Sequence, residues 1–218
     1  MTVEVEVAAD ADEAARRVGA LLAEKAREAV DARGRCSVAL SKVPSTLVGA
    51  FVAAGLPWGA VDVYQVDERV AAAGSPDRNL TAILAAFPPD AVDSLLPMPV
   101  EAPDLDDAAR LYEEELSHPL DVVHLGLGTD GHTASLVPGD PVLDVRDRRV
   151  AVTDEYEGFR RMTLTYPALD SAREIVWLVT GEEKRGALAR LLDGDDSIPG
   201  ARISNPRQLV VADTAAAP

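Results

Sequence analysis

Apolar residues recur with two different periods along this chain, and the two periods alternate through most of its length. Short runs of consecutive or alternating apolar residues predict strands, whereas apolar residues three and four positions apart predict helices. Strands are predicted at 3–7, 36–40, 61–66, 122–127, 150–153, 162–165, 175–180 and 208–212, and helices at 11–33, 47–54, 80–87, 104–117 and 182–192. Strands that alternate with helices predict an α/β fold, with a mainly parallel sheet and helices on both faces.

Proline, glycine and capping residues mark the ends of these elements. Asp10 can cap the first helix, and Gly34 follows its last turn. The stretch 71–79 is predicted as a loop, and the Pro-rich stretch 88–103 as a connection. This connection comes too early in the chain to separate a second core. Because 218 residues are enough for one large domain, we expect a single domain over residues 1–218.

The net charge of −16 narrows the range of partners. Nucleic acids and anionic membranes both require a basic face, so we expect neither as a partner. No apolar run approaches the roughly 18 residues of a membrane span. Cys36 is the only cysteine, which excludes an internal disulfide and a cysteine-based metal site. The N-terminal segment is acidic and lacks the features of a signal peptide, so we expect a cytoplasmic protein.

The apolar run 122–127 ends in a glycine-rich loop that carries acid–base groups. Gly128 and Gly131 surround Asp130, and His132 follows directly. In open α/β sheets, ligands bind beyond the carboxyl ends of the strands. An imidazole, whose ordinary pKa is about 6.5, can accept a proton from water near neutral pH. The loop is therefore a candidate active site; the structural alternative is that its acid and imidazole only stabilise a tight turn.

The same loop matches the dinucleotide-binding pattern Gly126-x-Gly128-x-x-Gly131. That pattern requires a helix that begins at the third glycine, and an acidic residue about twenty positions later. Pro138 permits at most two helical turns, so we do not expect a dinucleotide site. His124 lies inside the apolar run and is predicted to be a core histidine with satisfied hydrogen bonds.

Basic side chains stand at the ends of three other predicted strands. Arg69 ends one strand, Arg161 opens a second, and Lys184 lies at the start of the helix after a third. Gathered at one edge of an acidic protein, they would form a positive pocket for an anion. Helices that begin after the 41–46 loop and after Gly181 would add N–H donors for a phosphate. Each basic residue alone would be a solvated surface charge, and only their joint placement favours a site.

The segment GLGTDGHTASLVPG resembles the signature of 6-phosphogluconolactonases, usually G-x-G-x-D-G-H-T-A-S-L-F-P-G, with Val137 in place of the phenylalanine. Further segments resemble the family in the same order: VYQVDERV with the downstream Asp77-x-Asn79, RRMTLTYPAL, and WLVTGEEKRGAL. The resemblance runs from about Cys36 to the C-terminus. It implies a modified Rossmann-like fold of the phosphosugar isomerase/deaminase type. It also implies hydrolysis of 6-phospho-D-glucono-1,5-lactone in the pentose phosphate pathway, without a metal or organic cofactor.

The resemblance further implies a role for individual residues. His132 would be the general base that activates water, and Asp67 or Asp130 would orient it or the substrate. The residues that would bind the substrate are Ser41, Lys42, Ser45, Thr46, Arg69, Gly128, Gly131, Arg161 and Lys184. The expected partner is a small phosphosugar lactone, and the expected assembly is a monomer or a homodimer.

One segment departs from the family pattern. The family carries S-G-G-S-T-P after its first core strand, whereas this chain has SKVPST at 41–46. Val43 cannot cheaply adopt the positive φ of a glycine. Either Lys42 replaces the lost N–H donors with a point charge, or the protein is a non-catalytic or redirected sugar-phosphate-binding protein. The related glucosamine-6-phosphate deaminases carry a glutamate five residues after the histidine, where this chain has Val137, which argues against deamination.

Overall fold

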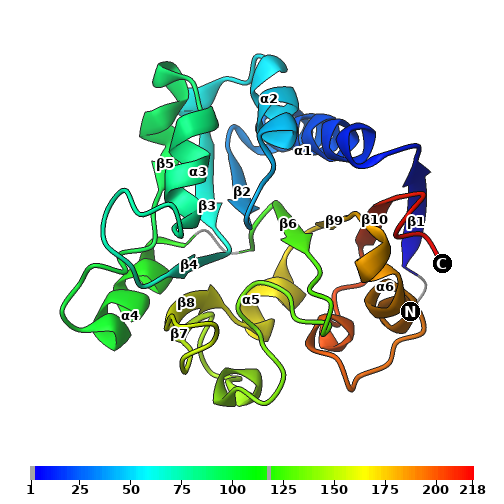
Figure 1. Ribbon diagram of the computed structural model, residues 1–218. Coiled ribbons are helices and arrows are strands. Elements are labelled where there is room, and N and C mark those ends of the chain that lie inside the picture. The colour runs from blue at the N-terminus through cyan, green and yellow to red at the C-terminus, as the bar shows by residue number, and fades with distance from the viewer. Residues whose placement is uncertain (1–2, 117–118) are drawn as a thin grey trace.

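A seven-stranded parallel sheet forms the centre of the computed structural model, which describes residues 3–116 and 119–218 (Figure 1). Its strands lie in the order β1 (Glu4–Ala8), β10 (Gln208–Asp213), β9 (Ile175–Val179), β6 (Val122–Gly126), β2 (Cys36–Leu40), β3 (Val61–Gln65) and β5 (Leu95–Leu96). Every pairing between them is parallel, which confirms the predicted fold class. The chain winds in opposite directions from β2 and β6, so the carboxyl ends of these neighbouring strands form the switch point where ligands bind in such sheets.

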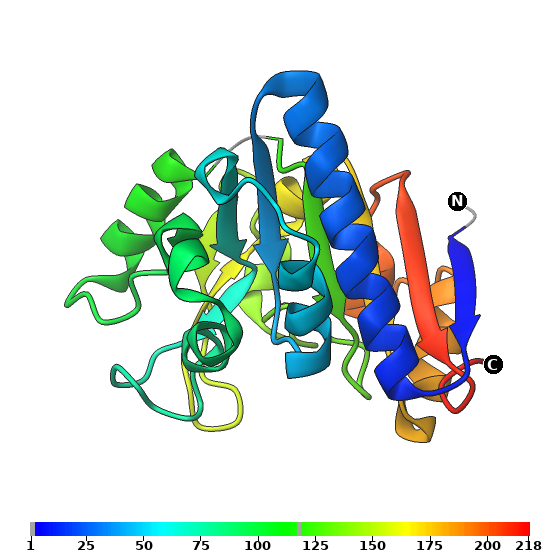
Figure 2. The ribbon, with the colours of Figure 1, turned by 90° about the horizontal axis from the view of Figure 1, so that it is seen from above.

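Helices cover both faces of this sheet. They are α1 (Ala11–Arg33), α2 (Ser45–Ala53), α3 (Asn79–Ala86), α4 (Leu105–Glu115), α5 (Tyr166–Ser171) and α6 (Arg185–Leu192). Figure 2 shows α1 and α2 lying along one face. Residues of α1, α2 and α3 share one core cluster, and residues of α4, α5 and α6 share the other. Val122 faces the first cluster and Val123 the second, as expected when side chains alternate along a buried strand.

Local chemistry explains the position of α1 and α2. The Asp10 side chain accepts a hydrogen bond from Glu13 N, and Gly34 ends the helix with φ of 76°, so both predicted caps are confirmed. Gly19 of α1 faces α2, where a Cβ would come within 2.8 Å of the Ala50 Cβ and closer still to a backbone oxygen. The small residue therefore lets the two helices pack closely, which fixes α2 beside the end of β2.

A second, three-stranded sheet was not predicted. It has the order β4 (Asp67–Arg69), β8 (Arg161–Leu164), β7 (Val150–Val152), and both of its pairings are antiparallel. Residues 67–69 are therefore a separate strand and not only the end of the preceding one. The β7 and β8 segments are joined by a tight hairpin and pair with each other, so they do not join the large sheet. This small sheet carries charged residues across to the carboxyl edge of the large sheet.

Several local predictions were wrong. Leu111, which the helical spacing of apolar residues in the stretch 104–117 predicts to face inward, is 48% exposed, and the neighbouring Tyr112 is buried in its place. The connection 88–103 contains a 3-10 helix and the short strand β5. The tail after β10 packs against the rest of the protein, because Ala216 is buried and the Thr214 hydroxyl donates to Ala9 O. The predicted helix end at residue 117 lies outside the described residues.

The remaining helical elements are short 3-10 turns: Trp58–Ala60, Pro89–Ser94, Pro141–Asp144, Glu182–Lys184 and Pro199–Arg202. The predicted helix 182–192 is thus a 3-10 turn followed by α6. Within residues 3–116 and 119–218, no helix is long and apolar enough to cross a membrane.

Candidate active site

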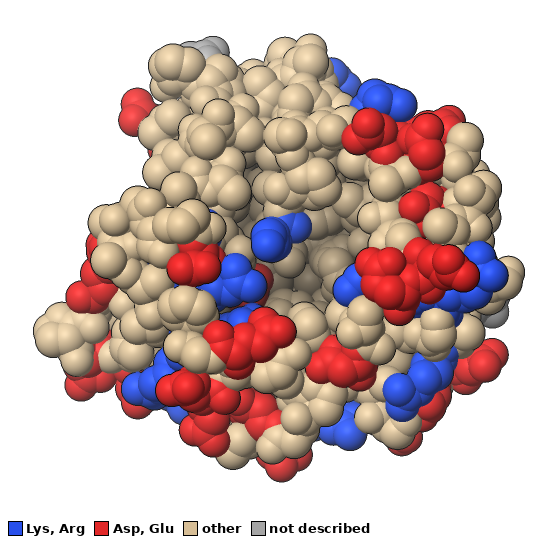
Figure 3. Space-filling model, viewed as in Figure 1, with Lys and Arg blue, Asp and Glu red and all other residues tan. Residues whose placement is uncertain are grey.

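Two adjoining cavities lie at the carboxyl edge of the large sheet. The first has a volume of about 160 Å³ and is lined by Ser41, Lys42, Asp67, Arg69, Asn79, Gly126, Leu127, Gly128, His132, Ala134, Arg161 and Lys184. The second, of about 430 Å³, shares Lys42, Gly126, Leu127 and Lys184 with it. Figure 3 shows a hollow near the middle of the molecule, bordered by Lys and Arg side chains, where β2 and β6 end in Figure 1. Together the two cavities reach the size range of ordinary small-molecule sites.

His132 and Asp130 form a hydrogen-bonded pair in the loop after β6. The Nδ1 atom of His132 lies 2.6 Å from Asp130 Oδ1, and the His132 backbone N–H donates to the same oxygen. Burial alone would raise the pKa of Asp130, but the backbone N–H and imidazole of His132 outweigh it and lower that pKa. The carboxylate therefore stays ionised and holds Nδ1 as the protonated nitrogen. This leaves the lone pair on Nε2 of the partly exposed imidazole as its hydrogen-bond acceptor.

Two glycines make this arrangement of the loop possible. A Cβ at Gly128 would overlap the His132 ring and come within 2.6 Å of Asp130 Oδ1. Gly131 has φ of 84°, and a Cβ there would collide with Ile198. The loop is closed by hydrogen bonds from Gly128 N to His132 O and from Gly131 N to Gly128 O. The glycines are thus required by close side-chain approach, and not by a helix that receives a pyrophosphate.

Asp67 lies in the same cavity but has different partners. Its carboxylate accepts hydrogen bonds from Ser135 Oγ at 2.7 Å and from Asn79 Nδ2 at 3.2 Å. Burial raises the pKa of Asp67, while the Ser135 hydroxyl and the charge of Arg161 oppose that shift. Of the two candidate acids, Asp130 is therefore the one paired with the imidazole.

A buried glutamate positions this acidic segment and the start of α3. The carboxylate of Glu68 accepts hydrogen bonds from the backbone N–H groups of Arg69, Asn79 and Leu80, and from the Gln65 amide. Glu68 is fully buried, and its four bonds compensate for the cost of burying a charge. It therefore ties the end of β3 to the helix that carries Asn79 into the cavity.

Four cationic side chains line the first cavity. Arg161 on β8 is buried, and its Nε has no hydrogen-bond partner among the described residues. Arg69 donates from Nη1 to Asp77 O. Neither Lys42 nor Lys184 forms an ion pair with a described residue. The structure therefore brings Arg69, Arg161 and Lys184 together as predicted, in a cavity whose positive charge is only partly compensated.

The 41–46 segment, which lacks the two glycines of the family pattern, has an ordinary backbone conformation and turns only part of its side chains to the site. Ser41 and Lys42 line the first cavity, and Val43 is buried in the core cluster beneath α2. No residue of the segment has a positive φ. Ser45 and Thr46 line neither of the two cavities, and the Thr46 hydroxyl donates to Asp12 on α1. Of the segment's four predicted binding residues, only the first two face the site.

His124 was predicted to be a core histidine with satisfied hydrogen bonds, and only the first part of this prediction is correct. It is buried in the middle of β6, but neither ring nitrogen has a hydrogen-bond partner within the described part of the chain. It lines the second cavity, on the face of the sheet that α2 covers. Burial lowers the pKa of His124 to about 4, so the imidazole is neutral at pH 7. His124 is therefore a core histidine, as predicted, but not a satisfied one.

Sequence reasoning missed some residues of the site. Asn79 entered only through the resemblance, and Ser135, which donates to Asp67, lies inside the segment that resembles the family signature but was assigned no role. Tyr156 gave no signal at all, yet its ring packs edge-on against His132 with centroids 5.8 Å apart. A contact of this kind joins segments 24 positions apart, so no local pattern reveals it.

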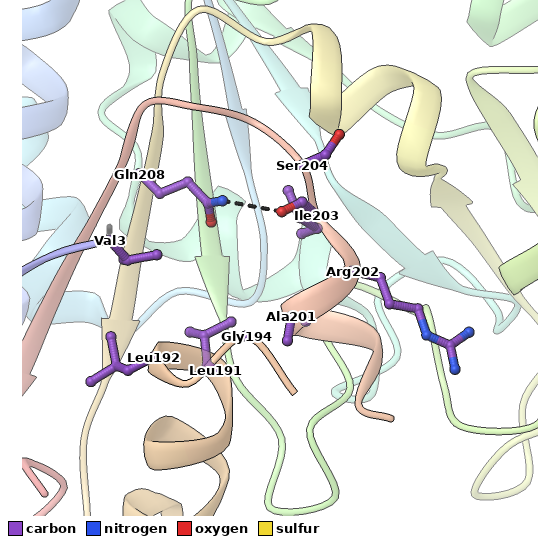
Figure 4. A pocket seen from close by; sticks show the side chains of 10 residues that line it. Val3, Leu191, Leu192, Gly194, Ala201, Arg202, Ile203, Ser204 and Gln208 are labelled. Carbon is purple, nitrogen blue, oxygen red and sulfur yellow. Dashed lines mark hydrogen bonds between the residues drawn. The ribbon is translucent and has the colours of Figure 1, made fainter. Parts of the chain in front are cut away.

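A third cavity, of about 270 Å³, lies between α6, the 3-10 turn 199–202 and β10 (Figure 4). Its lining contains no His, Asp, Glu, Cys or Lys. The Gln208 amide within it donates to Ile203 O (Figure 4) and to Asn205 O. Among the described residues, no cluster of three or more His, Cys, Asp or Glu side chains is placed to hold a metal. This third cavity therefore offers no acid–base group of these kinds.

The sequence profile of the glucosamine-6-phosphate isomerases/6-phosphogluconolactonase family matches residues 9–212. The chain belongs to this family. The resemblance predicted from the motifs is thus confirmed over nearly the whole chain. Val137, at the position where the deaminase branch of the family was expected to carry a glutamate, is buried.

Family members with similar sequences include two cyanobacterial proteins. The 6-phosphogluconolactonase of Synechocystis sp. is 35% identical over 198 residues, covering 83% of this chain and 82% of its own. That of Nostoc sp. is 36% identical over 209 residues, covering 86% and 85%. The crystal structure of 6-phosphogluconolactonase from Thermotoga maritima has a TM-score of 0.85 at 22% identity, covering 97% of this chain and 99% of that one. A monomeric glucosamine-6-phosphate deaminase has a TM-score of 0.84 at 17% identity, covering 98% of each chain, so both branches share this fold.

Proposed function

We propose that the protein hydrolyses 6-phospho-D-glucono-1,5-lactone to 6-phosphogluconate, as a hydrolase of the oxidative pentose phosphate pathway. The names of its relatives support lactone hydrolysis. The observation that carries the proposal is the His132–Asp130 pair, which lies in one cavity with Arg69, Arg161 and Lys184. A base and a group of cations in the same cavity suit a substrate with an ester carbonyl at one end and a phosphate at the other.

In the proposed reaction, His132 Nε2 takes a proton from water as the water oxygen bonds to the lactone carbonyl carbon. Asp130 stabilises the imidazolium that forms and keeps Nδ1 protonated throughout. The bond from the carbonyl carbon to the ring oxygen then breaks, and His132 returns the proton to that oxygen. Water is consumed, the ring opens to a carboxylic acid that releases its remaining proton to the solvent, and the enzyme regains its starting state. A δ-lactone needs little further activation, so positioning and one base are sufficient.

The cations have two tasks in this proposal. Lys42 and Lys184 form no ion pair with any residue that the structure describes, so they are available to the phosphate. The free Nε of buried Arg161 supplies a directed hydrogen-bond donor. Positive charge also stabilises the negative charge that develops on the carbonyl oxygen.

A second candidate function rests on the 41–46 segment. Val43 is buried and Thr46 donates to Asp12, so this segment offers fewer groups to a phosphate than a glycine-rich loop would. The alternative is a sugar-phosphate-binding protein that has lost turnover or changed its substrate. In that case Lys42 would serve binding alone.

One experiment separates the two functions: acid release from freshly made 6-phosphogluconolactone, measured above the spontaneous rate. We expect turnover by the wild-type protein and a loss of between about 10²- and 10⁴-fold in kcat for His132→Ala. The double variant Lys42→Gly, Val43→Gly is the matched comparison for the phosphate loop. Wild-type inactivity together with activity in the double variant would favour the binding function.

A further inference from the structure

A tight hairpin turn projects one aromatic side chain toward the catalytic pair. Tyr156 and Phe159 exchange backbone hydrogen bonds across the two central residues Glu157 and Gly158. Their φ values are 51° and 81°. Positive φ at both central positions is the geometry of two-residue hairpins whose twist matches the flanking strands. The turn therefore holds Tyr156 in a defined place, although it lies outside the large sheet.

Tyr156 contacts the His132–Asp130 pair in two ways. Its hydroxyl donates to Asp130 Oδ2 at 3.4 Å, the carboxylate oxygen that His132 Nδ1 does not use. Its ring meets the imidazole edge-on at an interplanar angle of 64°. Burial and the charge of Asp130 raise the pKa of Tyr156, so the hydroxyl remains a donor at neutral pH. One side chain thus fixes both the carboxylate and the imidazole.

The same tyrosine also holds Arg161. The guanidinium carbon of Arg161 lies 5.0 Å from the centroid of the Tyr156 ring, and Nη2 donates to Tyr156 O at 3.3 Å. Arg161 Nη2 also contacts the carboxylate of Glu157 in the same turn, whose side chain is 65% exposed. Stacking on a ring restrains a guanidinium without neutralising it. The charge of Arg161 therefore remains available to an anion in the cavity.

We propose that Tyr156 is a positioning residue that holds the general-base pair and the phosphate-binding arginine in register. It does not line the cavity, and so acts through Asp130 and Arg161. The inference rests on the proposed function, because it assigns the two groups to opposite ends of one phosphosugar lactone. A substrate that spans both groups reacts only if their separation is fixed, and misplacement of about 1 Å can cost about 100-fold in rate.

Two substitutions separate the contact of the Tyr156 hydroxyl with Asp130 from the contact of its ring with Arg161. Tyr156→Phe removes the hydroxyl but keeps the ring and the backbone oxygen, so only the bond to Asp130 is lost. We expect a decrease of about threefold to tenfold in kcat with an unchanged KM. Tyr156→Leu also removes the ring over Arg161. We expect the same loss in kcat, together with a threefold to tenfold rise in KM.

The test combines lactone kinetics with titration calorimetry of inorganic phosphate, which reports on Arg161 without turnover. Phosphate affinity should match wild type in Tyr156→Phe and fall in Tyr156→Leu. Phe159→Leu is the control for general damage to the turn, because Phe159 pairs with Tyr156 through backbone atoms, and it should match wild type in both measurements.

An unchanged kcat in Tyr156→Phe, or wild-type phosphate affinity in Tyr156→Leu, would overturn the inference. Equal losses in Phe159→Leu would also overturn it, since the turn as a whole would then be responsible. If the wild-type protein does not hydrolyse the lactone, the proposed function fails. The phosphate titrations still decide the Arg161 contact in that case.

Discussion

Replacing His124 with leucine should make the protein more stable. The imidazole is 1% exposed, and neither of its nitrogens has a partner in the described residues. In the sheet register His124 lies between Leu40 and Val176, which are both apolar. A buried polar group left without a hydrogen bond costs about 1–3 kcal/mol. Leucine would remove this cost and fill a similar volume, so we expect His124→Leu to raise the free energy of unfolding by about 1–3 kcal/mol at pH 7.5.

The gain should grow in mild acid. The folded-state pKa of His124 is about 4, against about 6.5 in the unfolded chain. Between these values the unfolded state binds a proton that the folded state does not, so wild-type stability falls as the pH falls through this window. This pKa difference corresponds to a total loss of about 3 kcal/mol in the wild-type free energy of unfolding, of which about 2 kcal/mol is lost between neutral pH and pH 5. Leucine binds no proton, so His124→Leu should not lose this part of its stability in acid.

The assay is urea unfolding of both proteins at pH 7.5 and pH 5.0, followed by tryptophan fluorescence and circular dichroism. We expect the stability difference between the variant and the wild type to be about 2 kcal/mol larger at pH 5.0. Comparison between the two proteins cancels the contributions of other titrating groups. A variant that is less stable at pH 7.5, or a difference that does not change with pH, would refute the reasoning. Either result would mean that the imidazole has a partner in the folded protein.

Two further predictions concern the glycine loop after β6, which carries the proposed general base. Gly128→Ala should reduce lactone turnover by at least about 100-fold, because the new Cβ would displace the His132 ring. Circular dichroism should show that the fold is intact. Turnover near the wild-type rate would contradict the close approach of His132 to Gly128. Asp130→Asn should lower kcat by about 10²- to 10⁴-fold across the pH range, because a neutral amide does not stabilise the imidazolium. Turnover by Asp130→Asn at the wild-type rate would shift the supporting role to Asp67.

The order and type of the main elements could be predicted because they depend on local patterns. The strands at 36–40 and 175–180 were identified from short, mainly apolar runs, and the structure has strands there with ends that differ by at most one residue. Asp10 and Gly34 act through atoms within four residues of themselves, so their capping roles could be read directly. The prediction for Leu111 was wrong. Tyr112 is the next residue along the helix and is also largely apolar, and the spacing of apolar residues favoured the wrong one of the two as the inward-facing residue.

The small sheet and the pairings inside the site depend on contacts between distant segments. Asp67 meets Ser135 across 68 positions, and Thr46 meets Asp12 across 34. The periodicity of each segment is the same whether or not these contacts form. The resemblance supplied the identity of the site residues but not their partners. It therefore left Asp67 and Asp130 as equal candidates, which the 2.6 Å contact of His132 distinguishes.

The cationic hollow in Figure 3 lies in a surface that is otherwise rich in acidic side chains. With a net charge of −16, the protein repels a phosphorylated ligand at long range, and the cations attract it only within about one Debye length, roughly 10 Å at 0.1 M salt. Added salt should therefore weaken the repulsion of an approaching ligand, which favours association, and also weaken the attraction of the bound ligand by the cations, which favours dissociation. Ring opening in the proposed reaction gives the ligand a carboxylate in addition to its phosphate. At short range the cations therefore attract the product more strongly than the substrate, and it is only outside the cavity that the net negative charge of the protein repels the product more strongly.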